Sequence, residues 1–261
     1  MDLRKSFDSE VANYDKWRPR YCNELFNDII EYSKLDSEKE CIEIGCGTGQ
    51  ATEPILKTGS SLLALELGEN FTEFTRNKFS HYKNFQIENA DFEKFELVNN
   101  KFDLMFSGTA FHWISEEIGY PKVYNILKSG GTIALFWNKP GPKSFDDQLH
   151  LKMQEVYAKY RGPEEMQKAK IERENPQERY AKIISTIEKY GFVGAECRLF
   201  KQVREFTADE YIGLLSTYSD NISLQEPVKT QFLTDIRDVI YSFNNIIKVY
   251  DTMELYLSKK P

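Results

Sequence analysis

Three closely spaced glycines follow a short apolar segment in the stretch CIEIGCGTGQ, residues 41–50. Each glycine adds to the conformational entropy lost on folding, so Gly45, Gly47 and Gly49 together need a physical reason. Glycine lets the backbone turn sharply and lets another group come close to the main chain. The stretch therefore predicts a strand that ends in a turn built for a close approach.

The spacing of these glycines argues against a dinucleotide site. Nucleotide-binding turns read G-x-G-x-x-G or G-x-G-x-x-A, whereas Gln50 occupies the last of these positions here. Glu43 precedes the turn, and its carboxylate would repel a pyrophosphate but suit a ligand with a positive amine. An NAD-dependent oxidoreductase is therefore disfavoured, and a cationic, phosphate-free cofactor is favoured.

Strand-like and helix-like segments alternate on both sides of the turn. The predicted strands of the first half are residues 41–44, 61–66, 84–89, 101–107 and 131–138. A helix is predicted from Pro121 to the pair Gly130 and Gly131. Beyond residue 138 the periodicity predicts helices over 149–160, 180–187, 208–217 and 228–240, with strands over 198–206 and 246–259. Such alternation is typical of a parallel sheet with helices on both faces.

Composition limits the classes of function that remain. The chain has 261 residues, 41% of them hydrophobic, and a formal charge of −7, which disfavours a nucleic-acid partner. No apolar run approaches the ~20 residues of a membrane helix and no signal peptide is seen, so we expect a cytoplasmic protein with no membrane partner. The cysteines form no CxxC pair, and we expect neither a metal site nor disulfides.

Two motifs together resemble a known family. The run EIGCGTGQ (residues 43–50) resembles the first motif of class I S-adenosylmethionine-dependent methyltransferases. The run FDLMFSGTAFHWI (residues 102–114) resembles the type-11 small-molecule subset, which includes enzymes similar to trans-aconitate methyltransferase. This resemblance, strongest over residues 7–140, implies S-adenosylmethionine as the cofactor and a small molecule as the methyl acceptor.

The same resemblance implies a fold and a division of the chain. The fold is an α/β, Rossmann-like sheet of seven mostly parallel strands in the order 3-2-1-4-5-7-6, with the last strand antiparallel, helices on both faces and a helical lid or insertion. We expect one methyltransferase domain over residues 1–261, acting as a monomer or homodimer. Its parts would be N-terminal lid helices (1–35), a cofactor-binding core (36–138), a helical insertion (139–175) and a C-terminal half of the sheet (176–261) with acceptor-site helices (207–245).

Cofactor contacts follow from the motif positions. Glu66 ends the second strand, where this fold places an acid for the ribose hydroxyls. Asp91 resembles the acid that receives the adenine amino group, although Asp is also a preferred N-cap residue. The full set of predicted cofactor residues is Tyr14, Arg18, Glu43, Gly45, Cys46, Gly47, Gly49, Gln50, Glu66, Leu67, Asp91, Phe92, Ser107, Gly108 and Thr109.

The acceptor is less determined by the sequence. Predicted substrate residues are Trp17, Trp113, Trp137, Asn138, Thr217, Tyr218 and Ser219. O-methylation of a carboxylate is the first hypothesis, because a carboxylate needs a cation such as Arg18, Arg20, Lys139 or Lys143 rather than a base. The alternatives are a phenol, amine or carbon acceptor with His112 as the catalytic base, and a cofactor-binding protein without catalysis.

Overall fold

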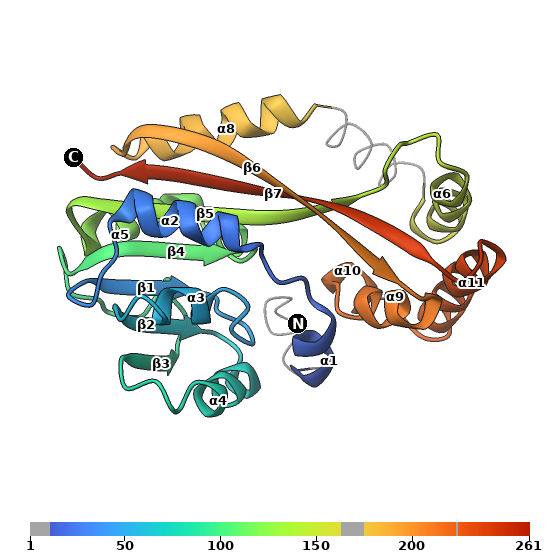
Figure 1. Ribbon diagram of the computed structural model, residues 1–261, viewed down its shortest axis with the longest axis horizontal. Helices are drawn as coiled ribbons and strands as arrows, with labels where there is room; N and C mark the ends of the chain where they lie inside the picture. The colour runs from blue at the N-terminus through green and yellow to red at the C-terminus, as the bar shows by residue number, and fades with distance from the viewer. Residues whose placement is uncertain (1–10, 163–174, 223) are drawn as a thin grey trace.

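Seven strands form one sheet in the order β3-β2-β1-β4-β5-β7-β6, which confirms the predicted fold. The computed structural model describes residues 11–162, 175–222 and 224–261 (Figure 1). The strands are β1 (Glu40–Ile44), β2 (Ser61–Glu66), β3 (Phe85–Asn89), β4 (Phe102–Gly108), β5 (Leu127–Gly141), β6 (Val193–Phe206) and β7 (Ile247–Lys259). All neighbouring pairs from β3 to β5 are parallel, and β7 runs antiparallel to both β5 and β6.

Helices cover both faces of the sheet. The helices are α1 (Val11–Trp17), α2 (Asn23–Ser33), α3 (Thr52–Leu56), α4 (Glu69–Lys78), η2 (Phe111–Trp113), α5 (Glu116–Ile126), α6 (Gln148–Arg161), α8 (Pro176–Lys189), α9 (Ala208–Leu215), α10 (Ser219–Ile222) and α11 (Val228–Ser242). On β4, Leu104 and Phe106 pack with α2 and α3, whereas Met105 between them packs with α5 and α8. This alternation is the period-2 pattern of a strand that is buried on both faces.

The C-terminal helices form a separate small core at one end of the long strands. Figure 1 shows α6, α9, α10 and α11 gathered beyond the ends of β6 and β7, away from β1–β3. Met153 of α6, Leu215 of α9 and Phe232 of α11 are buried together there, with Ile247 at the start of β7. We call this group of helices the cap.

Several expected element boundaries are wrong, among them the start of β6, which begins at Val193 rather than Arg198. The helix expected to begin at Pro121 begins five residues earlier, at Glu116, and Pro121 lies inside it. Burial of Tyr120, Val123 and Ile126 against the sheet outweighs the single hydrogen bond that proline removes. The strand expected from Gly131 already begins at Leu127, because residues 128–131 form a bulge between the pairs Phe102–Leu127 and Leu104–Thr132.

Parts of the expected lid and insertion, residues 1–10 and 163–174, lie outside the described residues. Of the two N-terminal helices, α1 lies beside α4 and α9, whereas α2 belongs to the layer that covers the sheet. Within the described ranges, none of the helices has the length and apolar character that a membrane crossing requires.

The glycine turn is fixed by two close approaches within the protein. Gly45 has φ +70°, and a Cβ there would lie 2.5 Å from the Cβ of Ala110 in the loop after β4. Gly49 has φ +80°, and a Cβ there would lie 2.2 Å from the Phe79 ring at the end of α4. Both positions therefore need glycine for the backbone conformation and for the space.

Replacing Gly49 with Ala is expected to lower the free energy of unfolding by about 1–3 kcal/mol more than replacing Gly130 with Ala. Gly130 is a matched control, because its φ of +77° is similar but nothing lies within 4 Å of a Cβ built there. Both variants share the strain of a left-handed residue, about 1–2 kcal/mol. Urea unfolding of the two variants measures the difference. Equal losses of unfolding free energy would show that the Phe79 contact does not determine the need for glycine at position 49.

Candidate active site

A pocket of about 300 Å³ lies where the glycine turn faces the carboxyl ends of β2 and β4. We call it the turn pocket. A side pocket of about 50 Å³ adjoins it and reaches Glu43, Cys46 and Gln50. Ligands of open α/β sheets collect at this edge, because the loops of successive parallel strands meet there.

Glu66 joins the glycine turn to the start of α4. Its side chain is 8% exposed, and its two oxygens accept hydrogen bonds from the backbone N–H groups of Gly47 (2.8 Å) and Gly68 (3.0 Å). These two amides orient the carboxylate. Glu66 also lines the turn pocket, where hydroxyl donors of a ligand would meet it.

Glu43 is a buried acid on β1. It is 1% exposed, and Thr52 Oγ1 donates a hydrogen bond of 2.6 Å to its Oε2. Burial raises the pKa of Glu43 to about 8, with a smaller contribution from the charge of Glu66, although the Thr52 hydrogen bond opposes the shift. Without a ligand, the carboxyl group is therefore largely protonated at neutral pH, and a cation in the side pocket would favour its ionised form.

Asn138 offers an acceptor atom to the same region. Its Nδ2 donates to Asp251 Oδ1 over 2.8 Å, and Arg204 holds that buried carboxylate from the other side through Nε and Nη2. With the amide oriented in this way, Asn138 Oδ1 is buried and has no hydrogen-bond partner among the residues that the structure describes, and Asn138 lines both pockets. A buried lone acceptor suits a ligand that carries N–H or O–H donors.

Comparisons with known proteins agree with this arrangement. Residues 42–135 match the model of a family described as "Methyltransferase domain". Residues 42–135 form a methyltransferase domain with the class I, S-adenosylmethionine-dependent fold. The matched range contains the glycine turn, Glu66, Asp91 and the loop after β4, which together build most of the turn pocket.

Individual relatives carry methyltransferase names. The chain is 32% identical over 163 residues to the Saccharomyces cerevisiae protein named "Probable S-adenosylmethionine-dependent methyltransferase CRG1", a match that covers 60% of this chain and 53% of the relative. It is 26% identical over 237 residues to malonyl-[acyl-carrier protein] O-methyltransferase 2 of Ilyobacter polytropus, covering 84% and 89% of the two chains. The specific similarity to trans-aconitate methyltransferase stays a prediction.

A solved structure shares the fold. Phosphoethanolamine N-methyltransferase 2 of Haemonchus contortus, in complex with phosphomonomethylethanolamine and S-adenosylhomocysteine, superposes with a TM-score of 0.57 at 14% identity. The match covers the whole of this chain and 60% of the other. At this identity the comparison concerns the fold alone.

Most predicted site residues of the methyltransferase meet at the two pockets. They are Tyr14, Arg18, Glu43, Gly45, Cys46, Gly47, Gln50, Glu66, Leu67, Asp91, Phe92, Gly108, Thr109, His112, Trp113, Asn138, Tyr218 and Ser219. Asp91 also caps the following turn, since its Oδ1 accepts from Glu93 N over 3.1 Å. The position of Asp91 is therefore compatible both with a contact to the adenine amino group and with a role as a cap.

Five predicted residues do not line these pockets. The Ser107 hydroxyl donates to Ile44 O over 2.7 Å, and Gly49 packs on Phe79 as described above. Thr217 is 1% exposed, and its hydroxyl donates to Leu214 O. Trp137 is buried behind the pocket, and Trp17 packs against Gly213 of α9. In each case a contact within the protein occupies a residue that the family resemblance assigned to a ligand.

The segment from α1 to Arg18 connects the glycine turn to the cap. The Tyr14 ring lies over Gly47, 3.4 Å from where a Cβ would be. The Arg18 guanidinium lies between the rings of Tyr14 and Tyr218, 4.8 and 4.6 Å from their centroids, and its Nη2 donates to Thr217 O over 2.6 Å. Arg18 therefore places positive charge at the boundary between the cofactor half and the cap.

The environment of His112 decides which of its nitrogens carries a proton. Trp137 Nε1 donates a hydrogen bond of 3.1 Å to His112 Nδ1. Partial burial lowers the pKa of His112, and the charges of Lys139 and Arg18 lower it further, so the ring is neutral at pH 7. A neutral imidazole has one acceptor nitrogen and one N–H, and therefore Nε2 carries the proton. His112 lines the turn pocket as a hydrogen-bond donor.

Some pocket residues were missed by the sequence reasoning. Phe71, Ala110 and Ile114 line the turn pocket, and Tyr21 lines the side pocket, where its hydroxyl lies 2.8 Å from Thr109 Oγ1. Ala110 and Ile114 fall inside the 102–114 motif and could have been found from it. Phe71 and Tyr21 carry no local signal, because folding of distant segments brings them to the pocket.

Stability of the cofactor-free protein is expected to fall between about pH 4.5 and pH 8 through Glu43. The unfolded chain releases this proton near the ordinary pKa of 4.5, whereas the folded chain keeps it until about 8, so rising pH favours unfolding. Glu43→Gln keeps an acceptor for Thr52 but cannot ionise. Urea unfolding at pH 5, 6, 7 and 8 should show the stability of Glu43→Gln rising relative to wild type. A constant difference across this range would contradict the buried, protonated acid.

Proposed function

We propose that this chain transfers the methyl group of S-adenosylmethionine to a carboxylate oxygen of a small molecule. The donor character of His112 carries the proposal. A neutral ring that offers Nε2–H can hold an anionic oxygen but has no basic nitrogen left for a phenol or amine. Arg18 adds positive charge at the same pocket. The relative from Ilyobacter polytropus, named as an O-methyltransferase, also supports an oxygen acceptor.

The pockets fit the cofactor that the domain requires. We assign Glu66 to the ribose hydroxyls and Asp91 to the adenine amino group, with Leu67 and Phe71 on the apolar walls. Glu43 and the lone acceptor Asn138 Oδ1 suit the ammonium group at the methionine end. The turn between Gly45 and Gly47 lies along that end.

The residues of the site act by holding and orienting. When bound, the cofactor supplies an electrophilic methyl group on a sulfonium. Arg18 and His112 Nε2–H hold the acceptor carboxylate, which is already ionised at neutral pH and needs no base. Tyr14 and Tyr218 flank Arg18 and keep water from one side of the site. Orientation of two reactants can contribute roughly 7–11 kcal/mol, so few catalytic groups are needed.

Glu66→Ala is expected to weaken binding of S-adenosylhomocysteine by about 1–3 kcal/mol, because it strands the ribose hydroxyls and frees the amides of Gly47 and Gly68. Isothermal titration calorimetry measures the change. Glu53→Ala is the control, since Glu53 is exposed on α3, pairs with Lys57 and Tyr82, and does not line either pocket. Unchanged affinity in Glu66→Ala would remove this residue from the site.

Methyl transfer to carboxylic acids is expected to survive in His112→Gln and to fall about 10- to 150-fold in His112→Ala, the range for a hydrogen bond to a charged group. Glutamine can replace the Nε2–H donor but cannot accept a proton. Methyl-labelled cofactor and a panel of acids, phenols and amines provide the assay, and label in a methyl ester is released as methanol by alkali.

His81→Gln serves as the control for this assay, because His81 contacts the neighbouring Tyr82 ring and lies outside the lining of the turn pocket and the side pocket. Equal loss in His112→Gln and His112→Ala, with label that resists alkali, would select the base mechanism and a phenol, amine or carbon acceptor. Binding of S-adenosylhomocysteine without transfer to any compound would select a non-catalytic protein.

A further inference from the structure

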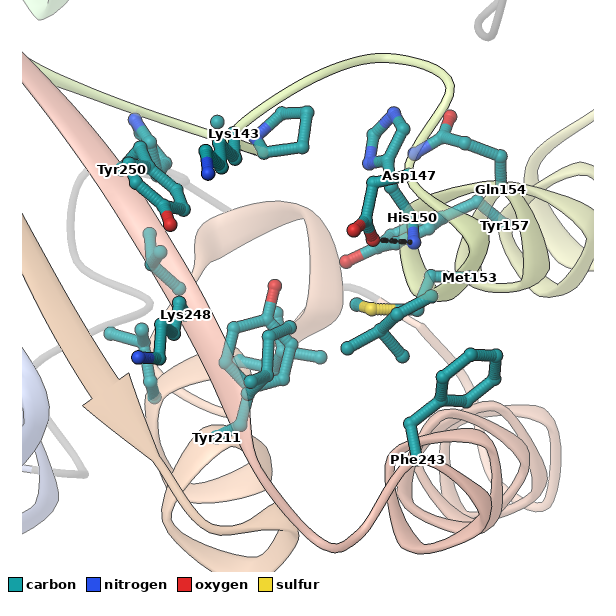
Figure 2. Close-up of a pocket in the computed structure, with 18 of the residues that line it drawn as sticks. Lys143, Asp147, His150, Met153, Gln154, Tyr157, Tyr211, Phe243, Lys248 and Tyr250 are labelled. Carbon is teal, nitrogen blue, oxygen red and sulfur yellow. Dashed lines mark hydrogen bonds between the residues drawn. The ribbon is translucent and has the colours of Figure 1, made fainter.

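A second, larger chamber lies inside the cap. Its volume is about 540 Å³, compared with about 300 Å³ for the turn pocket. Figure 2 shows its walls, which come from the end of β5, the start of β7, and helices α6 and α9. Cavities of this size hold ligands of drug-like dimensions. We call it the cap chamber.

Apolar side chains form the buried wall of the cap chamber. Met153, Leu214, Leu215, Ile247 and Val249 are each less than 9% exposed and line it. Tyr157 and Tyr211 add aromatic surface (Figure 2). Such a wall favours an apolar ligand group, because each methylene removed from water there contributes to binding.

Charged side chains stand at the exposed rim of the chamber instead. Lys143 and Lys248 are exposed, and so are Asp147 and Asp220, which gives two charges of each sign. Lys248 also pairs with Glu205 over 3.2 Å. The guanidinium of Arg161 is held by Asp220 and Asn221 and lies over the Tyr157 ring. With Arg161 included, three positive and two negative side chains line the chamber, but the ion pairs of Arg161 with Asp220 and of Lys248 with Glu205 offset two of the positive charges. The lining therefore gives little net charge to select a second charged group on the ligand.

Tyr218 connects the cap chamber to the reaction site. It lines the cap chamber, the turn pocket and the side pocket, and its ring lies 4.6 Å from the Arg18 guanidinium. Tyr218 therefore stands between the two volumes, and a ligand whose head is held by Arg18 and His112 would have to pass its ring to reach the chamber.

We infer that the cap chamber holds the apolar body of the methyl acceptor, so that the acceptor is a carboxylic acid with a medium-length alkyl or arylalkyl chain. This inference rests on the proposed function, which supplies the carboxylate end. The size of the chamber excludes acetate-sized acids as the preferred acceptors, because they would leave its apolar wall in contact with water.

The test measures binding of straight-chain carboxylic acids of increasing length to the full chain saturated with S-adenosylhomocysteine. Calorimetry with acids of about four to twelve carbons should show affinity rising about fourfold per methylene until the chamber is full. Affinity that does not change with chain length would overturn the inference.

Two variants test whether the alkyl chain of the acid lies in the cap chamber. Met153→Trp and Gln154→Trp add bulk on the face of α6 that lines the chamber, and both should shorten the chain length of tightest binding. Gln154 is only partly buried, so this second variant keeps the test open if Met153→Trp does not fold. Leu151→Trp is the control, since Leu151 lies on α6, is 42% exposed and does not line the chamber. If both chamber variants bind the acids with the same length dependence as the control, the inference is overturned.

Turnover in the same series separates this inference from the proposed function. Alkali-labile methyl esters formed from short and long acids at the same kcat/KM would overturn the chamber assignment and leave carboxylate methylation standing. Length-dependent binding with no ester from any acid would overturn carboxylate methylation and leave the chamber as a site for apolar ligands.

Discussion

The close approach of two loops at Gly45 is the constraint on which the rest of the site depends. The turn after β1 touches the loop after β4 so tightly that no Cβ fits between Gly45 and Ala110. The pairing of β1 with β4 in the centre of the sheet brings these loops together. Glu66 then fixes the far side of the turn through the amide of Gly47. The turn pocket is the space that remains between these contacts.

The acids of the site differ because their surroundings differ. Glu43 has one hydrogen-bond donor in its buried surroundings, and burial raises its pKa to about 8. Glu66, at the end of the neighbouring strand β2, is held by two backbone amides. The pair thus combines a fixed acceptor with a group that can release a proton when a cation arrives. Such a division of roles suits a cofactor that carries hydroxyls at one part and an ammonium at another.

The cap and the cofactor half are joined by few but specific contacts. Arg18 bonds to Thr217 O, and Trp17 fills the space left by Gly213 of α9. Lys78 of α4 holds the other side of this connection, with hydrogen bonds to Asp15 and to Thr48 O in the glycine turn. Because these contacts span both halves, the position of the cap over the turn pocket depends on α1.

The sequence by itself determined the strand order through family resemblance, and the central elements and the glycine turn through local patterns. The elements and the turn depend on short-range signals, namely the period of apolar residues and the permissive φ of glycine. Only the tertiary structure decided that Ser107 bonds to Ile44 O, that Trp137 turns His112 into a donor, and that the cap encloses a chamber. These outcomes depend on contacts between residues 25 to more than 100 positions apart. The local spacing of residue types in the sequence does not predict such contacts, because they depend on how the helices and the sheet pack together.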